Sequence, residues 1–126
     1  MNELLRQEAS RLLGQFSLSQ DWLTAGSVSA ALLTPSGNVY SGICLDMACG
    51  IGFCAEHAAI ADMLKARETV IESIVAVRAD GIVPPCGRCR ELMLQVDSAN
   101  RHTRIWLSET QAIALGELLP QSWMEL

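Results

Sequence analysis

Hydrophobic side chains follow a helical period in some segments of the chain and a strand-like pattern in others. Near the N-terminus, apolar side chains recur three and four residues apart, which predicts an amphipathic helix that ends near Phe16. The runs 27–33 and 39–45 have the apolar and β-branched content of strands. Because the Thr-Pro-Ser-Gly-Asn segment between them favours a turn, the two runs predict a β-hairpin.

The rest of the chain alternates between the two patterns. The predicted elements are a helix over 54–67, a strand over 71–79, a helix over 86–96 and a last strand over 104–108, which precedes a segment over 112–119 that ends at Pro120. An Asp-Gly and Pro-Pro segment is expected to form the loop before the second of these helices. This order of elements predicts the α/β class, with three layers and a mixed sheet.

Length, composition and charge narrow the class of protein. The chain has 126 residues, of which 50% are hydrophobic and 5% aromatic, so we expect a single domain over 1–126 with an aliphatic core. Nine basic and fourteen acidic residues give a net charge of −5, the wrong sign for a protein that neutralises phosphates, so no nucleic-acid partner is expected. Early acidic residues do not fit a signal peptide, and glycine and proline interrupt the longest uncharged stretch. We expect no membrane segment and a cytoplasmic location.

Three of the five cysteines are candidate metal ligands. Cys86-Gly-Arg-Cys89 has a spacing typical of metal or thiol chemistry, and an odd number of cysteines does not suit a secreted disulfide framework. Residues three apart place both sulfurs on one side of a first helical turn, and Cys54 begins another predicted helix that can supply a third ligand. Helix N-termini stabilise thiolates. Three protein ligands leave one position of a tetrahedral Zn²⁺ site open to water, as in catalytic sites.

Glu56 is the candidate catalytic residue because it lies two residues after Cys54. A carboxyl group beside bound water can take up and deliver protons. In zinc nucleobase deaminases, a His or Cys, any residue and Glu precede a Pro-Cys-x-x-Cys motif, and the Glu is a proton shuttle rather than a ligand. Both motifs occur here, as Cys54-Ala55-Glu56 and as 85–89. A redox Cys-x-x-Cys is an alternative, but it leaves Glu56 without a role.

On these motifs the chain resembles the cytidine deaminase family, particularly its small forms and the blasticidin S deaminases. Segments 27–33 and 117–120 also resemble the family's first strand and its terminal segment. The resemblance implies an α/β/α fold, Zn²⁺ held by three cysteines and hydrolytic removal of an exocyclic amine. It also implies a homo-oligomer, a tetramer or a dimer.

The resemblance assigns charge compensation to one residue near the zinc motifs. Three thiolates exceed the charge of Zn²⁺, so a positive group is expected beside them. Tetrameric cytidine deaminases usually carry an arginine where this chain has His57, whereas Arg88 occupies the position used in blasticidin S deaminases. We therefore expect Arg88 to compensate the sulfurs from outside the coordination shell.

The substrate-binding positions depart from those of nucleoside-specific members. The family's phenylalanine on the first strand falls near Gly26, its asparagine near Cys44 and its glutamate at Asp46. A thiol is a poor substitute for an amide, whereas Asp46 can still accept a hydrogen bond. The remaining expected substrate contacts are Ala55 and Trp123, the latter in the place of a family aromatic that packs over the base, often from an adjacent subunit.

The predicted function is zinc-dependent hydrolytic deamination of an amino-pyrimidine nucleoside or related small molecule, from a cytidine-like to a uridine-like product with release of ammonia. Two alternatives stay open at this point. One is a deaminase of blasticidin S or another modified cytosine, and the other is a zinc-stabilised protein that binds a ligand without turnover. The intact Glu56 argues against the second. The sequence gives no clear role to Cys49 or His57.

Overall fold

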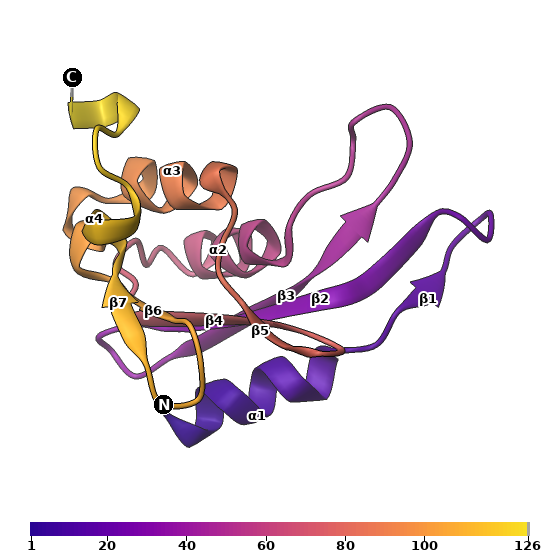
Figure 1. Cartoon of the computed structure of the whole chain (residues 1–126), viewed down its shortest axis with the longest axis horizontal. Coiled ribbons are helices and arrows are strands. Elements are labelled where there is room, and N and C mark those ends of the chain that lie inside the picture. The colour runs from indigo at the N-terminus through magenta and orange to yellow at the C-terminus, as the bar shows by residue number, and fades with distance from the viewer. Residues whose placement is uncertain (126) are drawn as a thin grey trace.

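A mixed seven-stranded sheet forms the centre of the computed structural model, which describes residues 1–125 (Figure 1). Its strands are β1 (Phe16–Ser17), β2 (Thr24–Leu33), β3 (Val39–Asp46), β4 (Ser73–Arg78), β5 (Gly81–Val83), β6 (Arg104–Trp106) and β7 (Ala112–Ala114). The main path is β1-β2-β4-β6-β7, with β3 paired to β2 and β5 to β4. The β4 and β6 strands are parallel, whereas the other pairs are antiparallel.

Helices cover both faces of this sheet (Figure 1). They are α1 (Glu3–Leu12), α2 (Ala55–Lys65), α3 (Gly87–Val96) and α4 (Leu115–Leu118), with 3₁₀ turns η1 (Ser98–His102) and η2 (Trp123–Glu125). On one face, Leu5 and Ala9 of α1 pack against β4 and Trp106. On the other face, Met63 of α2 and Met93 of α3 belong to the larger aliphatic core. The predicted three-layer α/β/α fold is therefore confirmed.

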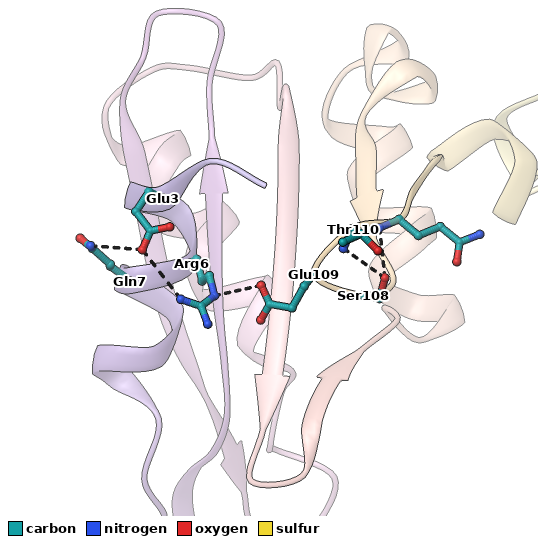
Figure 2. Close-up of polar contacts among 7 residues, drawn as sticks. Glu3, Arg6, Gln7, Ser108, Glu109 and Thr110 are labelled. Carbon is teal, nitrogen blue, oxygen red and sulfur yellow. Dashed lines mark hydrogen bonds and ion pairs between the residues drawn. The ribbon is translucent and has the colours of Figure 1, made fainter.

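Two contacts fix the helices relative to the sheet. A Cβ atom at Gly42 of β3 would lie 2.4 Å from the Cβ of Ala58, so α2 packs directly on the backbone of that strand. On the opposite face, Arg6 Nε donates to Glu109 Oε2 at 2.9 Å and joins α1 to the β6–β7 connection (Figure 2). The Gly42 contact is the one that matters for function, because it sets the position of the N-terminus of α2.

The structure corrects the predicted boundaries at both ends of the chain. The first helix ends at Leu12 rather than near Phe16, because the chain turns to pair with β2 and the Gly14 N–H donates to the Gly26 carbonyl at 3.0 Å. The segment predicted over 112–119 divides into two elements, because 112–114 form β7 against β6 and α4 follows. Pattern analysis also missed β1, β5 and η1. Within residues 1–125, no helix combines the length and the apolar character needed to cross a membrane.

Candidate active site

Three cysteine sulfurs meet where α2 and α3 begin. Cys54 and Cys86 are the N-cap residues of these helices, both with extended backbone, and Cys89 lies in the first turn of α3. The Cys86 sulfur lies 3.6 Å from that of Cys54 and 3.5 Å from that of Cys89, and all three sulfurs lie within 4.8 Å of one another. These separations are too long for disulfide bonds, which measure about 2.05 Å. The three thiols are free and grouped.

The geometry of this cluster fits a zinc ion. Zinc binds sulfur at about 2.3 Å, so two sulfurs of a tetrahedral site lie about 3.8 Å apart. The two S–S distances above are close to that value, and thiolates are ligands that zinc prefers. Burial ranges from the exposed Cys86 to the fully buried Cys89, so one side of the cluster is accessible. The residues present therefore match a three-sulfur centre with an open position.

The surroundings of the sulfurs affect their ionisation differently. Burial raises the pKa of both Cys54 and Cys89 above the ordinary value of a thiol. Burial also disfavours the Cys86 thiolate, but hydrogen bonds from the Cys89 backbone N–H, the Cys89 and Cys54 thiols and the Arg88 backbone N–H together more than offset it and lower the pKa of Cys86. The start of α3 thus stabilises one thiolate, as expected of a helix N-terminus. A bound cation would promote deprotonation of the other two.

Glu56 lies beside this cluster in the first turn of α2. Its side chain is only 5% exposed, and burial raises the pKa of the Glu56 carboxyl. Because its pKa is raised, a carboxyl group in such a site stays protonated to a higher pH than an exposed glutamate does. This is the property required of a group that exchanges protons with a substrate.

His57 and Arg88 both lie near the sulfurs, in different ways. His57 Nδ1 is 3.5 Å from the Cys89 sulfur, and burial, together with the charge of Arg88, lowers the pKa of His57. Arg88 is exposed, and within residues 1–125 no hydrogen bond joins its guanidinium to a sulfur. The expectation that Arg88 compensates the cluster stays a prediction, and His57 is the side chain in contact with a sulfur.

A cavity of about 650 Å³ opens beside the sulfurs and Glu56. It brings together most of the residues singled out in the sequence, namely Cys44, Asp46, Cys54, Ala55, Glu56, Cys86 and Arg88. Its wall also includes Trp22 and Ser27, which motif analysis did not assign to a site. The cavity wall therefore combines the buried Glu56 with exposed residues, among them Trp22, Cys86 and Arg88.

Polar side chains from β2 and β3 meet in the wall of the cavity. Ser27 Oγ donates to Asp46 Oδ2 at 3.1 Å and lies 3.2 Å from the sulfur of Cys44. That sulfur also accepts the backbone N–H of Val28 at 3.3 Å. A register shift in the β2–β3 pair between Ala25 and Ser29 accompanies this arrangement. Cys44 is thus held by the strand backbone, whereas Asp46 stays exposed to the cavity.

Comparison with known proteins decides the family. No family model matches the chain. A cytidine deaminase from Halalkalibacterium halodurans is 34% identical over 99 residues, which is 74% of this chain and 74% of that protein. This chain belongs to the cytidine deaminase family. The resemblance found in the zinc motifs is confirmed, and with it the expectation of an enzyme of the aminohydrolase type.

Solved structures of cytidine deaminases share the fold. The enzyme from Mycobacterium tuberculosis has a TM-score of 0.78 and 24% identity, covering 95% of this chain and 94% of its own. The enzyme from Burkholderia pseudomallei has a TM-score of 0.77 and 25% identity, covering 98% of this chain and 100% of its own. The family fold therefore extends over nearly the whole chain.

Trp123 is the predicted substrate contact that the structure does not bring to the cavity of its own chain. It lies in η2, its side chain is 69% exposed, and its backbone N–H donates to Glu91 Oε1 at 2.8 Å.

Trp22 is the opposite case, a cavity residue that no sequence motif assigned to the site. It is 68% exposed and lines the cavity. No local motif marks this position, because it depends on how the β1–β2 connection folds.

Proposed function

We propose that the protein is a single-domain, zinc-dependent hydrolase that removes the exocyclic amine of a cytidine-like amino-pyrimidine. Membership of the cytidine deaminase family supports a deaminase acting on small molecules of this class. The observation that carries the proposal is the buried Glu56 beside three grouped sulfurs at the end of one cavity. That arrangement provides ligands for a metal, a proton shuttle and space for a ring.

The residues of the site have distinct roles in this proposal. Cys54, Cys86 and Cys89 would hold the ion, and zinc, when bound, supplies Lewis-acid activation of water. Glu56 accepts a proton from the water that adds to the ring carbon bearing the amine. The same carboxyl group then delivers this proton to the adjacent ring nitrogen. It next transfers the second proton, from the added hydroxyl, to the amine, so that the C–N bond breaks, ammonia leaves and the hydroxyl oxygen becomes the ring carbonyl. The backbone at Ala55 lines the cavity next to these groups.

A modified cytosine is a second candidate substrate. In nucleoside-specific members, an amide and a larger acid occupy the positions that Cys44 and Asp46 hold here. Loss of hydrogen bonds to a buried hydroxyl can change discrimination by several kcal/mol. A deaminase of the blasticidin S type therefore fits the cavity wall as well. A panel of cytidine, 2′-deoxycytidine and modified cytosines, followed by ultraviolet absorbance, separates the two candidates.

We also propose that the protein forms a homo-oligomer, a tetramer or a dimer, in the cytoplasm. Trp123 and Met124 are 69% and 56% exposed, and neighbouring large apolar side chains of this kind favour contact with another protein surface. All five cysteines lie within residues 1–125 and are free, which suits a reducing compartment. Light scattering of the purified protein measures the oligomeric state.

The zinc proposal is tested with three variants. Cys86→Ser is expected to lose bound zinc and to unfold at a lower temperature, because metal binding contributes to folding. Glu56→Gln is expected to keep the metal and the fold but to release ammonia at least about 100-fold more slowly. Cys49→Ser is the matched control, because Cys49 is an exposed thiol outside the cluster. Full zinc content in Cys86→Ser, or normal turnover in Glu56→Gln, would contradict the proposal.

A further inference from the structure

Trp22 is an exposed aromatic side chain in the cavity wall that the proposed reaction does not use. Its side chain is 68% exposed and borders the same cavity as Glu56 and Asp46. A lone apolar side chain on a protein surface needs no explanation. An aromatic side chain in the wall of a cavity is different, because aromatic groups supply much of the contact area in ligand sites.

The strand register places Trp22 close in the chain to the pair that holds Asp46. Thr24 of β2 lies opposite Asp46 of β3, and Trp22 is two residues before Thr24. The β1–β2 connection and the segment that follows β3 project from the same side of the molecule (Figure 1). Glu56 instead is 5% exposed and lies beside the sulfurs at the start of α2. A ring that presents its amine to Glu56 can therefore direct a substituent towards Asp46 and Trp22, which border the same cavity.

The backbone at Gly26 explains why an aromatic side chain cannot come from β2 itself. Gly26 has a φ of +87°, and a Cβ atom there would lie 2.3 Å from the carbonyl oxygen of Gly14. The position near which the family's phenylalanine falls therefore has no room for a side chain. Phe53 also lines the cavity, but two backbone hydrogen bonds with Leu45 fix its segment to β3. Trp22 is the more exposed aromatic group.

Asp46 supplies the polar counterpart of this aromatic group. Its carboxylate accepts one hydrogen bond from Ser27 Oγ at 3.1 Å and a longer contact from the Cys44 sulfur at 3.8 Å. A carboxylate has about four acceptor positions, so capacity for further donors remains. The aromatic side chain and the carboxylate together suit a group that is apolar on one face and carries hydroxyl or amino donors at its edge.

We propose that Trp22 is a substrate-binding residue that packs against a donor-bearing substituent on the amino-pyrimidine ring, with Asp46 as the acceptor. The inference rests on the proposed function and specifies it, because it requires a ring-substituted substrate rather than a free base. Trp22 takes no part in proton transfer, since an indole offers a hydrogen-bond donor but no group that exchanges protons near neutral pH. It therefore determines specificity through binding.

Steady-state kinetics with cytidine and cytosine test this role. Trp22→Ala is expected to raise KM for cytidine about 10-fold and to leave kcat within about 3-fold, because stacking remote from the reacting carbon is equal in ground and transition states. Its effect on cytosine is expected to stay below about 3-fold. Leu18→Ala is the matched control, since Leu18 is an exposed apolar side chain of the same connection outside the cavity wall.

Tryptophan fluorescence gives a binding readout that does not need turnover. The measurement uses a Trp123→Phe background, because Trp123 is the other exposed indole. In this background cytidine is expected to quench the parent protein and its Trp106→Phe variant, whose tryptophan is buried under α1, but not its Trp22→Phe variant. Equal quenching in the Trp22→Phe variant, no quenching of the parent, or a Trp22→Ala defect shared by cytosine and cytidine would overturn the inference. A shared defect accompanied by a change in oligomeric state would assign Trp22 to an interface instead. Quenching without ammonia release would refute the proposed reaction and leave the Trp22 contact supported.

Discussion

At the residue scale, Asn100 joins two segments that flank the core. Its side chain is fully buried, accepts the Ile71 N–H at 2.8 Å and donates to the carbonyls of Thr69 at 3.0 Å and Met93 at 2.9 Å. Asn100→Leu leaves these backbone groups without partners, so we expect the free energy of unfolding to fall by about 3 kcal/mol in urea titrations. Asn38→Ala removes an exposed amide contact and serves as the control. Equal losses in the two variants would contradict this account.

Gly26 offers a second test at this scale, because Gly37 has the same φ of +87°. A Cβ at Gly37 meets nothing within 4 Å, whereas a Cβ at Gly26 lies 2.3 Å from the Gly14 oxygen. Gly37→Ala is expected to cost about 1 kcal/mol for the left-handed backbone alone. Gly26→Ala is expected to cost clearly more, because a strand must move, and to raise KM. Thermal unfolding of both variants measures the difference, and identical melting temperatures would argue against the clash.

The sequence predicted the reacting end of the site better than its substrate-binding end. Cys54 and Cys86 begin helices, so local spacing places Glu56 beside Cys54 and Cys89 beside Cys86, and the packing of α2 and α3 then brings the two helix N-termini together. Trp22 and Ser27 reach the cavity through a strand connection and a shifted register. Neither feature has a signal in residue types or in periodicity.

At the scale of elements, a strong hydrophobic periodicity predicted the central helices and strands. Errors occurred in short segments whose structure depends on pairing with another strand. The segment 112–114 has helical neighbours in sequence, yet it forms β7 because Ile113 pairs opposite Ile105 at the sheet edge. Similarly, Gly81–Val83 was expected as a loop but forms β5 against β4. Short strands of this kind depend on long-range partners, which a local pattern does not contain.

The β2–β3 hairpin carries a pH-dependent link to the segment after α2. Tyr40 Oη donates to Glu68 Oε2 at 2.6 Å, and Asn38 Nδ2 donates to the same oxygen at 2.9 Å. These two hydrogen bonds lower the pKa of Glu68 from 4.5 to about 2. A carboxyl group with a depressed folded-state pKa stabilises the protein above pH 4.5 and loses that contribution as the pH falls towards 2. Tyr40→Phe is therefore expected to lower stability more at pH 7 than at pH 3.

Urea titrations of Tyr40→Phe and the wild type at the two pH values provide the measurement. Lys65→Met is a suitable control, because its ion pair with Asp62 is highly exposed on the Lys65 side and includes neither Tyr40 nor Glu68. A loss of stability in Tyr40→Phe that is the same at pH 7 and pH 3 would show that the hydroxyl acts without ionised Glu68.

At the scale of the whole molecule, α3 connects the three-cysteine cluster to the C-terminal segment. Arg90 Nε donates to the Pro85 carbonyl at 2.8 Å, and its Nη1 donates to the Leu118 carbonyl at 3.0 Å. The next residue, Glu91, accepts the N–H of Trp123. The side chains of Arg90 and Glu91, which are adjacent in the sequence, thus hold both Pro85, the residue before Cys86, and the segment that carries Trp123. This places the exposed indole on a surface outside its own cavity, where a second copy of the chain can meet it.

If Trp123 completes the site of a neighbouring copy, two defective variants will restore each other. Glu56→Gln lacks the proton shuttle and Trp123→Ala lacks the indole, so each homo-oligomer is expected to deaminate poorly. In mixed oligomers, some sites combine an intact Glu56 with a Trp123 from the other chain, and activity should exceed the average of the two parents. Ammonia release after co-refolding measures this gain, with Glu56→Gln and Cys86→Ser as a control pair whose defects lie in one cavity. Activity equal to the parental average, in oligomers shown by light scattering to be mixed, would assign Trp123 a role within its own chain.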